Sequence, residues 1–168
     1  MSLSQRVSTL VERGEYQEAS SALAAEASLP EELIATKILV NSHLGDLRKA
    51  QTAAEVLLRR HTEPKTAAIC KSIIGRSILV HGGPTSEGLK YVEDARGIAH
   101  QKLGPIDFAR YSAEYVATLL HRVGISEAAA QVDSVNALNR AQKLHDSSAQ
   151  AIAMLAVARV VGSNGVTR

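Results

Sequence analysis

Six histidines and a single cysteine are the side chains of this sequence that are best suited to chemistry. The histidines are His43, His61, His81, His100, His121 and His145. Each stands near the expected C-terminal end of a helix, where an imidazole can bond the last carbonyls and favour the helix dipole. If helical hairpins stack, His43, His81 and His121 lie along one edge. Neighbouring helices are about 8–10 Å apart, whereas zinc needs its nitrogens at about 2 Å, so we expect capping and no metal.

Cys70 lies among Ile69, Ile73 and Ile74. One cysteine excludes a disulfide framework, and a cysteine in such surroundings is most often a small buried apolar side chain. The segment Gly82-Gly83-Pro84 lacks the following Lys and the preceding strand of a phosphate-binding loop. No triad or ligand set is found, so we expect a protein that is not an enzyme and that uses no cofactor.

Length and charge set the class of protein. The 168 residues fit one domain, 1–168, and carry 19 basic and 17 acidic side chains, a net charge of +2. The longest basic runs are pairs, Arg48-Lys49 and Arg59-Arg60, which argues against a nucleic-acid partner. The longest apolar run, 151–158, is too short to span a bilayer. A cytoplasmic protein without a membrane segment is the expectation.

Four prolines divide the chain into helices, because proline is tolerated in the first turn of a helix. Pro30, Pro64, Pro84 and Pro105 all fall where helical periodicity breaks. The third hairpin is expected to begin its second helix with Thr85 or Ser86 as N-cap, and later helices with Ser126 and with Asp146 or Ser147. The predicted helices are 3–12, 15–27, 31–44, 46–60, 64–80, 85–102, 105–123, 126–144 and 147–161. They form hairpins 3–27, 31–60, 64–102 and 105–144, followed by a terminal helix.

Two similar corners join these helices. The sequence Gly14-Glu15-Tyr16-Gln17-Glu18-Ala19 returns 31 residues later as Gly45-Asp46-Leu47-Arg48-Lys49-Ala50. Both resemble the corner of the tetratricopeptide repeat, and the corners at Gly83 and Gly124 resemble it in degenerate form. The resemblance implies an all-α fold, an α-solenoid of about four stacked antiparallel hairpins plus a terminal helix, with corner glycines in left-handed conformation.

A second resemblance concerns residues 95–123. A helix that ends in Leu103-Gly104 and leads into a long apolar helix is similar to divergent repeat arrays of bacterial transcription activators and signal-transduction ATPases. It implies a segment of a larger bacterial regulator.

The tetratricopeptide resemblance also implies where a partner binds, because the first helix of each such hairpin lines a concave groove. The groove residues expected from it are Ser4, Ser8, Ala35, Leu39, His43, Cys70, Ile73, Ser77, His81, Tyr111, Glu114 and Thr118. A clamp for a peptide carboxylate needs Lys and Asn, whereas Ser4, Ser8, Thr36, Cys70 and Ile74 stand at the matching positions. We therefore expect a regulatory scaffold that binds a helix or an apolar peptide, unless a later helix covers this face. The alternative is a sensor that holds a small molecule between hairpins.

The terminal segment Ala151–Val161 carries one charge, Arg159, and is apolar nearly all round. Residues Ile152, Leu155, Ala156 and Val160 can pack on the fourth hairpin. Met154, Val157, Ala158 and Val161 then remain uncovered, and an apolar patch of this kind usually marks an interface. We expect the patch to be covered by self-association, giving a homodimer, or by a further helix of a longer chain.

Overall fold

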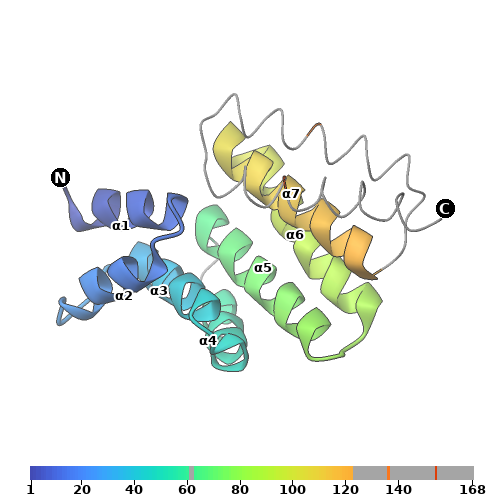
Figure 1. The fold of residues 1–168 in the computed structure, drawn as a ribbon, viewed down its shortest axis with the longest axis horizontal. Helices are drawn as coiled ribbons and strands as arrows, with labels where there is room; N and C mark the ends of the chain where they lie inside the picture. The colour runs from blue at the N-terminus through green and yellow to red at the C-terminus, as the bar shows by residue number, and fades with distance from the viewer. Residues whose placement is uncertain (61–62, 123–135, 137–153, 155–168) are drawn as a thin grey trace.

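The computed structural model describes residues 1–60 and 63–122, together with Asn136 and Met154. Within these residues the chain is all-α, and each helix packs against the next along the chain (Figure 1). The described helices are α1 (Leu3–Glu12), α2 (Tyr16–Ala24), α3 (Glu31–His43), α4 (Leu47–Arg60), α5 (Pro64–Val80), α6 (Thr85–Lys102) and α7 (Pro105–Arg122). The boundaries expected from the sequence agree within a few residues, and those of α1, α5 and α6 agree fully.

The helix starts follow local capping chemistry. Pro64 and Pro105 are the first residues of α5 and α7, and Pro30 and Pro84 directly precede α3 and α6. The prediction of Thr85 or Ser86 as N-cap is wrong, because α6 already begins at Thr85 and Pro84, which has no capping side chain, holds the cap position. A capping box that we did not predict starts α1, in which Ser2 and Gln5 bond each other's backbone amides.

The predicted corners are present at the first two positions. Gly14 and Gly45 have φ of 74° and 115°, a region that favours glycine. At the third corner Gly82, with φ of 76°, takes this role instead of Gly83. The last residues of the two corner sequences, Ala19 and Ala50, are both buried.

Among the described residues, the core consists of three clusters that follow one another along the chain. The first joins α1 and α2 to α3, through Val7, Leu23 and Val40 among others. The second joins α3 and α4 to α5, and the third joins α5 and α6 to α7. Consequently α3 and α5 each contribute buried side chains to two clusters and connect them.

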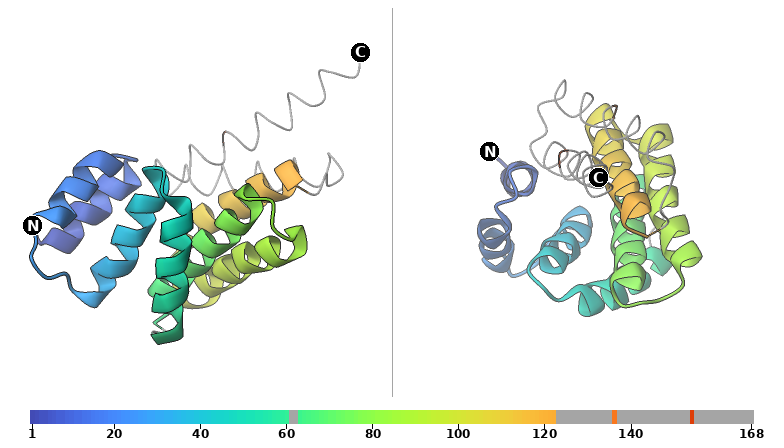
Figure 2. Two further views of the ribbon diagram at one scale, coloured as in Figure 1. Left: turned by 90° about the horizontal axis from the view of Figure 1, so that it is seen from below. Right: turned by 45° about the vertical axis from the view of Figure 1, so that its right-hand side comes forward.

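Among the described helices, α5 and α6 share the most extensive contact, and they lie side by side in both views of Figure 2. Gly75 on α5 faces Gly88 on α6: a Cβ on Gly75 would lie 2.6 Å from the Gly88 carbonyl oxygen. These two glycines let the backbones approach, and we did not predict this contact from the sequence. α5 also packs against α3 and α4, so it is the central helix of the described chain.

Three predictions fall outside the described residues: the fourth corner at Gly124, the helix 126–144 and the helix 147–161. The N-caps Ser126, Asp146 and Ser147 lie there too. Within the part of the chain that the structure describes, no helix is both long enough and apolar enough to cross a membrane.

Candidate functional site: a groove between alternate helices

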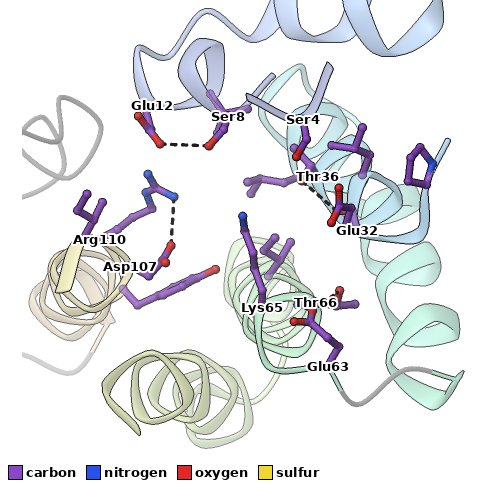
Figure 3. A pocket seen from close by; sticks show the side chains of 17 residues that line it. Ser4, Ser8, Glu12, Glu32, Thr36, Glu63, Lys65, Thr66, Asp107 and Arg110 are labelled. Atoms are coloured by element: carbon purple, nitrogen blue, oxygen red, sulfur yellow. Dashed lines mark hydrogen bonds and ion pairs between the residues drawn. The ribbon is translucent and has the colours of Figure 1, made fainter. Parts of the chain in front are cut away.

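A pocket of about 550 Å³ lies between α1, α3, α5 and α7, which are the first helices of the predicted hairpins (Figure 3). Its lining combines apolar, polar and charged side chains. The lining residues are Ser4, Ser8, Val11, Glu12, Pro30, Glu32, Leu33, Thr36, Leu39, Glu63, Lys65, Thr66, Ile69, Ile106, Asp107, Arg110 and Tyr111. We call this pocket the groove.

Charged side chains enter the groove from every one of its helices. Lys65 extends from the first turn of α5 towards the centre (Figure 3). Glu12 approaches from α1 and accepts a hydrogen bond of 3.1 Å from the Ser8 hydroxyl. On α7, the Arg110 guanidinium lies 3.8 Å from the Asp107 carboxylate. The groove can therefore bind groups of either charge.

A further acidic group serves the helix as well as the groove. The Glu63 carboxylate accepts hydrogen bonds from the Thr66 backbone amide, at 3.2 Å, and from the Thr66 hydroxyl, at 3.3 Å. It therefore caps the start of α5, where the helix dipole favours a negative charge. This cap holds the first turn of α5, and with it Lys65, in place at the groove.

Of the residues expected to line a partner groove, Ser4, Ser8, Leu39 and Tyr111 line this pocket. Ile73 and Ser77 do not, since both are 0% exposed within α5. We expected a partner face on this side of α5, but α3, α4, α6 and α7 all contact the helix and bury it. Tyr111 is 5% exposed, and burial, followed by the nearby Glu114 carboxylate, raises the pKa of its hydroxyl.

Glu114 and Thr118 are placed beyond the groove, towards the C-terminal end of α7. Both Glu114 carboxylate oxygens accept from the Ser72 hydroxyl of α5, at 2.8 and 2.9 Å. The Thr118 hydroxyl donates to the Glu114 carbonyl oxygen. The contact between Ser72 and Glu114 therefore joins α5 to α7 directly.

His43 makes a similar bridge between α3 and α5. Its ring stacks on Tyr16, with centroids 4.2 Å apart and planes 6° apart. Its Nε2 lies 3.4 Å from Arg76, which also donates to the Ser42 hydroxyl at 2.6 Å. Partial burial, and then the guanidinium groups of Arg76 and Arg110, lower the pKa of His43 to about 4. His43 is therefore neutral at pH 7 and accepts from Arg76.

His81 caps the end of α5, as its position in the sequence predicts. Its Nδ1 lies 2.9 Å from the Ser77 carbonyl oxygen. Since a carbonyl oxygen only accepts, this nitrogen carries the proton. Neither His43 nor His81 lines the groove.

The groove lies nearer the N-terminal ends of α5 and α7 than we predicted. Glu32, Lys65, Asp107 and Arg110 were missed. One local signal was available, because Asp107 and Arg110 have the spacing of a helical ion pair in the first turns of α7. No pattern in the sequence indicates where along the helices the groove lies.

Cys70 is fully buried, as expected, and burial raises the pKa of its thiol to about 11. A thiol is nucleophilic as the thiolate, so this environment disfavours reactivity. Over residues 1–60 and 63–122 no three His, Cys, Asp or Glu side chains gather in a way that could hold a metal ion.

The predicted contact patch of the terminal helix lies largely outside the described residues. Met154 is helical and exposed, whereas Val157, Ala158 and Val161 are outside. Comparisons with protein-family models, with curated proteins and with solved structures found no match to this chain.

Proposed function

We propose that this chain is a non-enzymatic protein-interaction module, regulatory in role, that binds a segment of a partner protein in the groove. We further propose that its helices form a tetratricopeptide-like α-solenoid. The observation that carries the proposal is that α1, α3, α5 and α7 together line one groove. Stacked hairpins place their first helices on a common face, and a core of successive clusters is what such stacking produces.

The chemistry of the groove favours a peptide segment over a small molecule. Small-molecule pockets are mostly apolar, with a few polar groups. Here apolar side chains such as Leu33, Leu39 and Ile69 share the lining with acidic groups on α1, α3 and α7 and at the N-cap of α5, and with Lys65 and Arg110. A peptide matches this mixture, because it offers alternating side chains together with backbone donors and acceptors.

The test compares two threonines that make the same local bond. The hydroxyl of Thr36 donates to the Glu32 carbonyl, and that of Thr9 donates to the Gln5 carbonyl, but only Thr36 lines the groove. Thr36→Arg fills the groove, whereas Thr9→Arg adds the same side chain elsewhere. A partner recovered by affinity capture is purified and titrated against the wild type and both variants.

We expect Thr36→Arg to weaken binding of the partner about tenfold or more, which is about 1.4 kcal/mol of binding free energy. Thr9→Arg should leave the affinity unchanged. Circular dichroism must show both variants folded. Equal affinities for all three proteins would contradict binding in the groove. A small molecule that is retained in native mass spectrometry and lost from Thr36→Arg would favour the alternative, a ligand-sensing segment of a regulator.

Self-association through the terminal patch remains a separate proposal. It predicts that light scattering finds a dimer, and that Val157→Glu converts it to a monomer by placing a charge in the patch. A wild-type protein that stays monomeric at high concentration would contradict it.

A further inference from the structure

The outer face of α4 carries four cations. Arg48, Lys49, Arg59 and Arg60 are all exposed, and we call them the basic stripe. The other side of the helix is buried through Ala50, Ala54 and Leu57. No ion pair between described residues involves Arg48, Arg59 or Arg60, and Lys49 pairs with Asp46 at 2.7 Å on the exposed surface.

The stripe has a regular geometry. Each residue of the first pair stands 11 positions before its counterpart in the second pair, which is three helical turns or about 16 Å. At 100° per residue the two pairs lie on nearly the same side of the helix. The exposed Ala53 and the 44% exposed Val56 lie between them. The acid of this segment, Glu55, is half-buried and accepts a 2.8 Å hydrogen bond from Gln51.

A pocket with apolar and polar lining residues adjoins the N-terminal end of the stripe. It has a volume of about 370 Å³ and lies between α3 and α4. Ile38, Leu44, Ala50 and Ala53 supply its apolar lining. Its polar lining comes from Asn41 and from the ion pair of Asp46 with Lys49 of the stripe. The volume is ample for one large aliphatic side chain.

We propose that this face of α4 is a second docking surface, for an acidic amphipathic helix of a partner protein. Carboxylates of the partner helix pair with the cations at both ends of the stripe. An aliphatic side chain of the partner, one helical turn from a carboxylate pair towards the middle of that helix, enters the pocket. This surface lies on the second helix of its hairpin, so it is separate from the groove, and the proposal stands independently of the proposed function.

The same observations disfavour other anionic partners. Nucleic-acid surfaces combine cations with aromatic side chains or with clusters of many cations, whereas the apolar residues beside the stripe are aliphatic and form a pocket. A membrane-surface helix needs a broad apolar face, whereas the exposed face of α4 offers Val56 and Ala53. An acidic helix uses both the charge and the pocket.

The probe is a fluorescent 16-residue helical peptide of Ala and Gln, with two Glu pairs three turns apart and a Leu one turn inside each pair. One control peptide replaces Glu by Gln, and another replaces Leu by Ala. Fluorescence anisotropy measures binding to the full chain at low and at physiological salt. The protein variants are Arg59→Glu with Arg60→Glu on the stripe, and Lys90→Glu with Lys102→Glu on α6, which makes the same change in net charge at exposed positions.

We expect the Glu peptide to bind the wild type, and the stripe variant to weaken it about tenfold or more at low salt. The α6 variant should change the affinity less than twofold. The Gln peptide and the Leu-to-Ala peptide should both bind more weakly than the probe. Thr36→Arg in the groove should have no effect, which separates this surface from the proposed function.

Three results would overturn the proposal: no binding of the Glu peptide by the wild type, equal weakening by the stripe and α6 variants, or no dependence on Leu. Tighter binding of a 16-base-pair DNA duplex, or of vesicles containing phosphatidylserine, than of the peptide would also overturn it. In that case the stripe would serve a nucleic acid or a lipid surface instead. Circular dichroism of both double variants confirms that any loss is not unfolding.

Discussion

Gly45 follows the end of α3 with φ of 115°, and no atom lies within 4 Å of the place where a Cβ would stand. The backbone alone therefore restricts this position. Side chains with a Cβ are strained at positive φ, and β-branched ones most of all.

Gly45→Val should lower the free energy of unfolding by about 1–2 kcal/mol, measured by chemical denaturation. Gly97→Ala is the matched control, because Gly97 lies inside α6, has ordinary φ, and has open space around its Cβ position. That substitution should raise stability by about 0.5–1 kcal/mol, since alanine favours a helix. A Gly45→Val protein as stable as the wild type would contradict the corner geometry.

His43 makes stability depend on pH. Its folded pKa of about 4 lies below the ordinary 6.5, so the unfolded chain takes up the proton first. The contribution of the neutral His43 to the free energy of unfolding is complete above pH 6.5 and is lost as the pH falls towards 4. Because His43 also has an exposed edge, where solvent screens the charge, we expect the free energy of unfolding to fall by only about 0.5–1 kcal/mol between pH 7 and 5.

His43→Gln keeps an acceptor for Arg76 and removes the titration. Denaturation curves at pH 7 and pH 5 should therefore differ less for this variant than for the wild type. The same pH dependence in both proteins would show that another group is responsible.

At the scale of elements, the pair α5 and α6 depends on close backbone approach. A Cβ on Gly75 would meet the Gly88 carbonyl oxygen at 2.6 Å, and backbone cannot move aside as the end of a side chain can. The short distance is what allows alanines such as Ala95 to bury completely between helices.

Gly75→Ala should therefore destabilise the protein by about 1–3 kcal/mol through overpacking, although alanine is the better helix former. Thermal denaturation against Gly97→Ala separates the two effects, because both substitutions place alanine inside a helix. Stabilisation by Gly75→Ala would mean that α5 and α6 lie farther apart.

At the scale of the whole molecule, stability is distributed unevenly. α5 contributes to two core clusters and contacts α3, α4, α6 and α7, whereas α1 and α2 share one cluster with α3. Segments with fewer buried contacts open more often.

Hydrogen exchange should accordingly be slowest for the amides of α5 and faster for those of α1 and α2. Mass spectrometry of peptic fragments resolves this order. Equal protection of α2 and α5 would contradict a core that is connected through α5.

Within the described residues, the sequence by itself determined the helices, and their ends to within a few residues. Pro64 and Pro105 begin helices, and Gly14 and Gly45 stand just past the ends of α1 and α3, because the backbone preferences of proline and glycine are local properties. The repeat resemblance predicted a partner groove along the first helix of each hairpin, and that groove stays a prediction. The structure shows one pocket lined by α1, α3, α5 and α7.

The tertiary structure decided where along those helices the groove lies and which side chains reach it. The repeat resemblance placed Ile73 and Ser77 on a groove face, yet they are buried because α5 has neighbours on several sides. Ser72 and Glu114 meet across 42 residues of sequence, and Gly75 approaches Gly88 between helices. Such contacts depend on the distances and crossing angles of packed helices, which the side chains of both partners set together. Local spacing in one helix does not contain that information.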